Sequence, residues 1–77
     1  MRTAAFLIPA YRARDSVADV IDGLRRAWAT AWERLEDSER SQWHADALCL
    51  TVDDGSGDET GARAEAAGAT VLRHPQN

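Results

Sequence analysis

Three short apolar runs, separated by two segments with helical signals, constrain the fold of this chain most strongly. The runs are Thr3–Pro9, Ala47–Val52 and Ala69–His74. The first two carry no charge, which is typical of strands buried on both faces. Pro9 is expected to end the first strand, because proline cannot donate to a central hydrogen-bond ladder. Strands that alternate with helices predict a parallel sheet with right-handed crossovers.

The segment between the first two runs predicts one long helix, from about Ser16 to Glu36. Its apolar residues recur at steps of three and four, which gives the helix one core-facing stripe. Ser16 and Asp19 form the S-x-x-D pattern of a capping box at its start. The polar stretch 38–46 that follows is expected to be a connection with one short helical turn.

The segment between the second and third runs predicts a short, alanine-rich helix over Thr60–Ala67. Ser56 and Glu59 supply a second capping box, and Gly68 stands where a helix C-terminal glycine belongs. The predicted order is therefore β-α-β-α-β. This is an α/β fold that makes half of a doubly wound, mainly parallel sheet.

Size and charge exclude several classes of protein. Seventy-seven residues allow one small domain, and the single cysteine excludes an internal disulfide framework and fits a reducing compartment. A net charge of −4 does not provide the basic face of a nucleic-acid-binding protein, so we expect no nucleic-acid partner. No apolar stretch approaches the roughly 20 residues that span a bilayer. We therefore expect no transmembrane segment and a cytoplasmic location.

The acidic turn after the second run, 53–59 (DDGSGDE), is the candidate functional segment. A calcium loop is excluded, because neither Gly55 nor Gly57 at the sixth loop position leaves oxygen ligands where an EF-hand needs them. A dinucleotide-binding turn reads G-x-G-x-x-G after the first strand, whereas here Gly55-x-Gly57-x-x-x-Gly61 follows the second. A Walker motif requires a lysine, and the chain has none.

The position of the acidic turn at the end of a predicted strand favours a third interpretation, in which the strand end binds a nucleotide. In an open α/β sheet, ligands bind outside the carboxyl ends of the strands. Asp53 and Asp54 end the second strand, and Gly55 allows a sharp turn after them. The first strand ends with a second group, Pro9, Ala10 and Tyr11. Neighbouring strands are expected to bring both groups into one crevice, where a carboxylate accepts a nucleobase N–H and the tyrosine packs on the base.

Three segments of the chain resemble the N-terminal part of family 2 glycosyltransferases, which have the GT-A fold. They read FLIPAYRARDSVADVIDGL, LCLTVDDGSGDET and GATVLRHPQN. The family opens roughly with an apolar strand, P-x-Y-N-E, a helix, a second strand, V-D-D-G-S-x-D-x-T, another helix, a third strand and an asparagine-glycine loop. The resemblance implies transfer of a sugar from a nucleotide diphosphate sugar to an acceptor that the sequence does not identify.

The resemblance also implies a donor-binding set. In it, Asp54 binds the base, Asp53 holds the turn and the pocket wall, and the P-x-Y segment lies against the nucleoside. The whole set is Pro9, Ala10, Tyr11, Asp53, Asp54, Gly55 and Ser56. Arg12 and Ala13 depart from the pattern, because the family commonly has asparagine and glutamate there. His74, ahead of the asparagine-glycine loop, is assigned no role.

The family's catalytic groups lie further along its sequence. Its D-x-D motif carries the divalent metal, Mg or Mn, and a later carboxylate is the general base. Residues 1–77 are therefore interpreted as the N-terminal nucleotide-sugar-binding portion of a GT-A domain, truncated after Asn77, with no catalytic or metal site of their own. Two alternatives stay open: a stand-alone nucleotide-binding or interaction module without catalysis, and a small dinucleotide-dependent redox domain.

Overall fold

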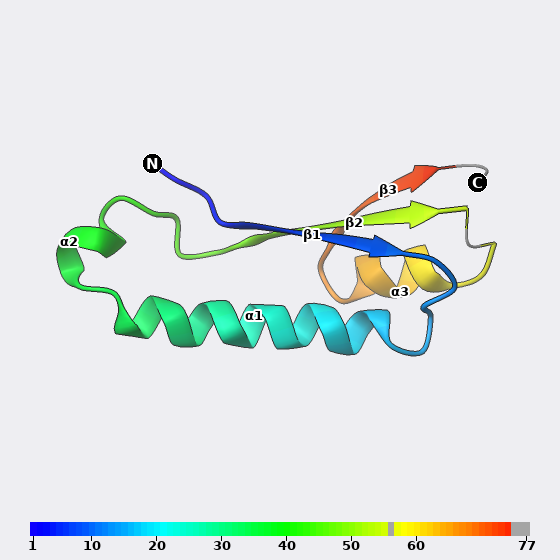
Figure 1. The fold of residues 1–77 in the computed structure, drawn as a ribbon, viewed down its shortest axis with the longest axis horizontal. Helices are drawn as coiled ribbons and strands as arrows, with labels where there is room; N and C mark the ends of the chain where they lie inside the picture. The colour runs from blue at the N-terminus through cyan, green and yellow to red at the C-terminus, as the bar shows by residue number, and fades with distance from the viewer. Residues whose placement is uncertain (56, 75–77) are drawn as a thin grey trace.

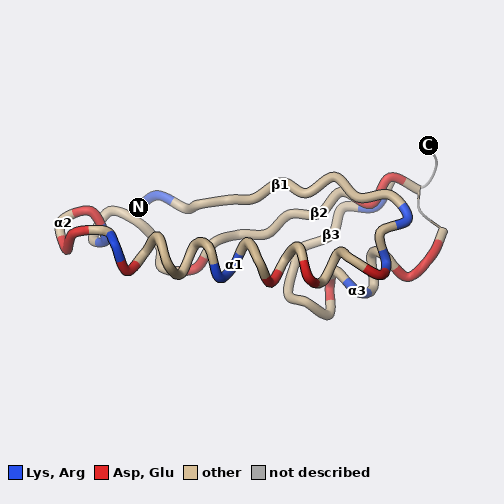
Figure 2. The backbone as a smooth tube through the Cα atoms, turned by 60° about the horizontal axis from the view of Figure 1, so that its bottom comes forward, with Lys and Arg blue, Asp and Glu red and all other residues tan. Residues whose placement is uncertain are grey.

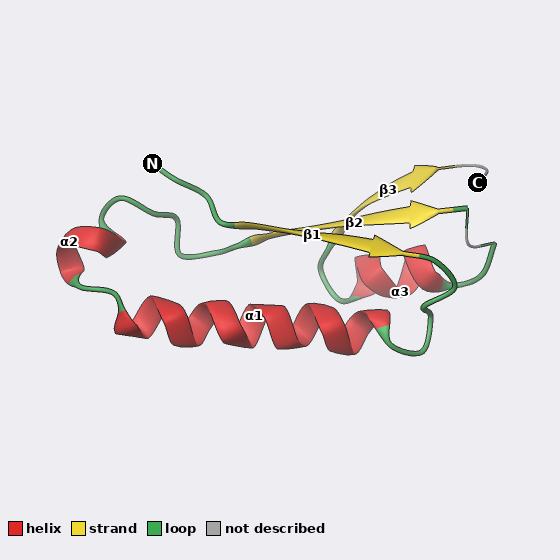
Figure 3. Ribbon diagram, in the orientation of Figure 1, coloured by secondary structure: helices red, strands yellow, loops and turns green. Residues whose placement is uncertain are grey.

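The computed structural model describes residues 1–55 and 57–74. Its elements, in chain order, are β1 (Ala5–Ala10), α1 (Val17–Arg34), α2 (Asp37–Arg40), β2 (Leu48–Asp54), α3 (Thr60–Ala66) and β3 (Thr70–His74). The strands form one parallel sheet in the order β1-β2-β3 (Figure 3). The predicted β-α-β-α-β fold is thus confirmed, and α2 is the short helical turn expected in the connection.

The two crossover helices, α1 and α3, lie on the same face of the sheet (Figure 1). This is the arrangement of one half of a doubly wound sheet. The core lies between the sheet and these helices, and most of its side chains are small. Its buried apolar residues are Ala10, Val17, Ile21, Cys49, Ala64 and Ala69.

The opposite face of the sheet has no covering layer in the described part of the chain (Figure 1). The expectation that the strands are buried on both faces is therefore wrong. Leu7 is 67% exposed, and Leu48 and Leu72 are also exposed. Because both crossovers have the same hand and β1, β2 and β3 follow one another in order, both helices must fall on one side. The apolar runs consequently alternate between a buried and an open side chain.

Two strand boundaries differ from the prediction. Pro9 lies inside β1, paired with Val52, and the strand continues to Ala10. In the described sheet β1 is an edge strand, where proline is tolerated because its missing N–H faces away from the ladder. The second strand runs two residues further than expected, because Asp53 and Asp54 pair with β3.

The helix ends test the predicted capping boxes and the predicted C-terminal glycine. Ser16 stands at the N-cap of α1, but its side chain makes no capping hydrogen bond, so the first capping box is wrong. Ser56 of the second box lies outside the described residues, and Glu59, at the N-cap of α3, makes no side-chain capping bond. Gly68 is confirmed as a C-terminal glycine. It has φ 98°, and the next residue, Ala69, donates back to Ala64 in a Schellman motif.

Candidate functional site

The carboxyl edge of the sheet brings the predicted residues together. Ala10, the last residue of β1, is the direct partner of Asp53 in the neighbouring strand. Tyr11 and Asp54 follow these partners by one residue each, so they stand at the same edge. Figure 2 shows acidic residues of the β2–α3 segment near basic residues of the β1–α1 loop at this end. Ser56 lies outside the described residues.

The two adjacent acids point to opposite faces of the sheet. Asp53 is only 7% exposed and faces α3, where a Cβ added at Gly61 would lie 2.9 Å from its Oδ2. The Asp54 side chain is 54% exposed on the open face, with its Oδ1 3.1 Å from His74 Nδ1. Alternation along β2 separates the pair in this way. Asp53 is thus buried between the sheet and α3, where it can form only the wall of a pocket, whereas Asp54 is exposed to solvent.

The loop after β1 is held by an unusual backbone conformation. Arg12 has φ 49°, in the left-handed region that few non-glycine residues adopt. Its Nε donates to the Tyr11 hydroxyl at 3.0 Å, and its guanidinium carbon lies 5.5 Å from the centre of the tyrosine ring. This hydrogen bond raises the pKa of Arg12 above its ordinary value. Asparagine, which the resembled family has here, is enriched in this backbone region.

A hydrogen-bond chain through Thr60 connects the two loops of the site. Thr60 is fully buried, and its Oγ1 accepts the backbone N–H of Ala13 at 2.9 Å. The Asp58 carboxylate accepts both the backbone N–H of Thr60, at 2.9 Å, and its hydroxyl. The β1–α1 loop is thereby fixed to the start of α3. Sequence reasoning omitted Asp58 and Thr60 from the site, although the final D-x-T of V-D-D-G-S-x-D-x-T was the available signal.

Asp58 makes the start of α3 sensitive to acid. The side-chain and backbone hydrogen bonds from Thr60 lower the pKa of Asp58 below its ordinary value. A carboxyl group whose pKa falls on folding stabilises the folded state above its unfolded pKa, and the contribution is lost as the pH falls through the folded value. We expect Asp58→Asn to unfold at lower urea concentration than the wild type near about pH 7, and the difference to shrink near about pH 3.

Urea titrations followed by circular dichroism at both pH values test this dependence. Asp22→Asn is the matched control, because Asp22 is exposed on α1. Its midpoint is expected to follow the wild type at both pH values. If Asp58→Asn lowered the urea midpoint by the same amount at both pH values, a role for the ionised carboxylate would be contradicted.

The resemblance implies a divalent metal, and the described residues do not fit one. Within 1–55 and 57–74 no three histidine, cysteine or acidic side chains come together. Asp53 and Asp54 cannot share an ion, because they face opposite sides of the sheet. The divalent metal expected for a full-length enzyme stays a prediction.

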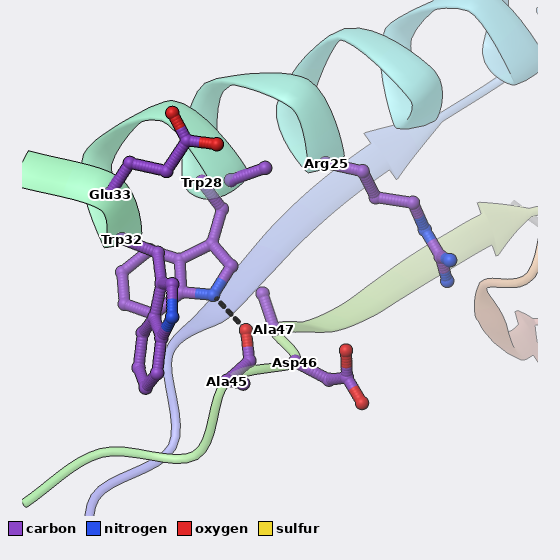
Figure 4. Close-up of a pocket in the computed structure, with 8 residues that line it drawn as sticks. Arg25, Trp28, Trp32, Glu33, Ala45, Asp46 and Ala47 are labelled. Atoms are coloured by element: carbon purple, nitrogen blue, oxygen red, sulfur yellow. Dashed lines mark hydrogen bonds between the residues drawn. The ribbon is translucent and has the colours of Figure 1, made fainter. Parts of the chain in front are cut away.

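A separate hollow of about 510 Å³ lies at the other end of α1, beside the amino end of β2 (Figure 4). Trp28 and Trp32 line it, and the Trp28 Nε1 donates to the Ala45 carbonyl at 2.6 Å. The Trp28 ring centre lies 6.2 Å from that of Trp32 and 6.0 Å from that of Trp43. These aromatic contacts fix the connection between α1 and β2. They are remote from the carboxyl edge and do not contribute to the candidate site.

Comparisons with known proteins do not assign the chain to a family. No protein-family model matches the sequence, and no curated protein matches it. None of the helices formed by residues 1–55 and 57–74 is long and apolar enough to cross a membrane. The interpretation of the site therefore depends on its geometry and on the sequence motifs described above.

Proposed function

We propose that this chain forms the base-binding part of the donor site of a nucleotide-sugar-dependent glycosyltransferase with a GT-A fold. One observation carries the proposal: the paired strand ends Ala10 and Asp53 place Tyr11 and Asp54 at a single carboxyl edge of a parallel sheet. Ligands of open α/β sheets bind at such edges. The V-D-D-G-S-x-D-x-T motif at this edge supports the same assignment.

In this proposal Asp54 accepts an N–H of the nucleobase. An ionised carboxylate only accepts hydrogen bonds, and the exposure of Asp54 leaves it accessible to a ligand. Tyr11, also exposed, packs against the base, while buried Asp53 and the turn at Gly55 form the wall. The divalent metal, the general base and the acceptor site then belong to a part of the protein outside residues 1–77.

Asp54→Ala is expected to weaken nucleotide binding by about 10- to 100-fold, because a hydrogen bond to a charged group contributes about 1.5–3 kcal/mol. Isothermal titration calorimetry with uridine, guanosine, cytidine, adenosine and thymidine diphosphates, each alone, measures the affinity. Asp22→Ala, on the exposed side of α1, is the control and should bind like the wild type.

Two results would count against the proposal. If the wild type bound none of the five diphosphates, the chain would not be a donor site. If Asp54→Ala bound as tightly as the wild type, the role of that carboxylate would be wrong. Nicotinamide dinucleotide belongs in the same titration, since its binding in place of the diphosphates would favour the redox alternative.

A second candidate is a binding or interaction module without catalysis. The open apolar face that exposes Leu7, Leu48 and Leu72 favours it, because exposed apolar patches often mark interaction surfaces. Both candidates allow nucleotide binding, but only the donor site requires the base to lie against Asp54 and Tyr11. Cooperative unfolding of the chain, together with nucleotide binding that Asp54→Ala and Tyr11→Ala leave unchanged, would favour the module.

A further inference from the structure

His74 makes a contact with the candidate base-binding carboxylate that no packing requirement explains. It ends β3 directly opposite Asp54 of β2. Its Nδ1 lies 3.1 Å from Asp54 Oδ1, and the two side chains are 62% and 54% exposed. Both lie on the face of the sheet that neither α1 nor α3 covers (Figure 1).

Among the described charged residues at this end of β2 and β3, Asp54 is the one that lies on the same face of the sheet as His74. Asp54 faces it from β2, whereas Asp53 and Arg73 lie on the helix-covered side, where Arg73 pairs with Glu65 of α3. An exposed ion pair contributes little to stability, typically below about 1 kcal/mol. The parallel register nevertheless keeps the two residues side by side, so the imidazole restricts the orientations of the carboxylate.

We propose that His74 is a positioning residue for Asp54: the imidazole engages Oδ1 and leaves Oδ2 directed toward the nucleobase at the carboxyl edge. This inference rests on the proposed function. A carboxylate held in one orientation loses less freedom when a ligand binds, which favours affinity.

The role of His74 needs an N–H donor beside Asp54 Oδ1, which the imidazole can supply at Nδ1. Removal of this donor is expected to weaken donor binding roughly two- to fivefold, the size of an exposed polar contact.

The experiment compares the wild type with His74→Leu, His74→Asn and His44→Asn. The probes are uridine diphosphate glucose and guanosine diphosphate mannose, two intact nucleotide diphosphate sugars with different bases. His74→Leu should bind roughly two- to fivefold more weakly than the wild type. His74→Asn keeps an N–H donor near Asp54 and should restore most of the affinity that His74→Leu loses. His44, exposed in the α2–β2 connection, is the control, and its variant should bind like the wild type.

A double-mutant cycle separates a positioning role from a direct contact with the ligand. If His74 acts through Asp54, His74→Leu should have no further effect in an Asp54→Ala background. An undiminished effect in that background would overturn the inference, as would wild-type affinity in His74→Leu. Both results leave the proposed function intact, whereas a wild type that binds neither probe removes the proposed function and this inference together.

Discussion

Ile21→Ala is expected to destabilise the chain by about 2–5 kcal/mol, the usual cost of truncating a buried isoleucine to alanine. Ile21 is the largest fully buried side chain, and its core neighbours include Val17, Cys49 and Ala64. Small neighbours cannot extend into the space that the isoleucine leaves, so the cavity persists. A domain of 77 residues has a stability of only roughly 4–12 kcal/mol. The substitution therefore removes a large fraction of the whole.

Urea unfolding followed by circular dichroism measures this loss. The control is Val20→Ala, one residue earlier on α1, because Val20 is 47% exposed. That substitution should change the free energy of unfolding by less than about 0.5 kcal/mol. Equal shifts for the two variants would mean that the face of α1 carrying Ile21 does not pack against the sheet as described.

The order of elements could be predicted because short apolar runs and helical periodicity are local signals. Along β2 the faces were also predicted: Leu48, Leu50 and Val52 lie on one side, Cys49 and Thr51 on the other. Alternation of side chains in a strand settles this without tertiary information.

Burial on both faces could not be predicted in the same way. An apolar run indicates that a strand can be buried. Whether helices cover one face of the sheet or both depends on how the crossovers are arranged. The exposed Leu7 and Leu72 show the difference. The end of β2 was missed for a related reason. Asp53 and Asp54 have low strand propensity, yet pairing with Arg73 and His74 of β3 extends the ladder through them.

The candidate site was chosen by a rule about sheet edges, which requires only strand order and direction. The rule does not give the direction of each side chain, so it grouped buried Asp53 with exposed Asp54. His74 and Thr60 were missed because their contacts, with Asp54 and with Ala13, join segments distant in sequence. Such residues emerge only when the register between strands and the position of α3 are known.

Thr60→Val is expected to destabilise the chain by about 1–3 kcal/mol and to weaken nucleotide binding as well. The substitution keeps the shape of a fully buried side chain and removes its oxygen. The N–H of half-buried Ala13 then loses its acceptor, and an unsatisfied buried donor carries about this cost. Because Ala13 follows Tyr11 and Arg12 in the β1–α1 loop, its release is also expected to loosen the part of the candidate site that is proposed to pack on the base.

Three variants separate the hydrogen bond from the packing at this position. Thr60→Ser keeps the hydroxyl and should retain most of the stability and of the affinity that Thr60→Val loses. Thr30→Val, at an exposed position of α1, should change neither urea midpoint nor affinity. If Thr60→Val lowered stability without lowering affinity for any nucleoside diphosphate, the link between the two loops would be structural only, and Tyr11 would not depend on it for binding. A loss of both, restored by serine, would place Thr60 among the residues that hold the site in its binding geometry.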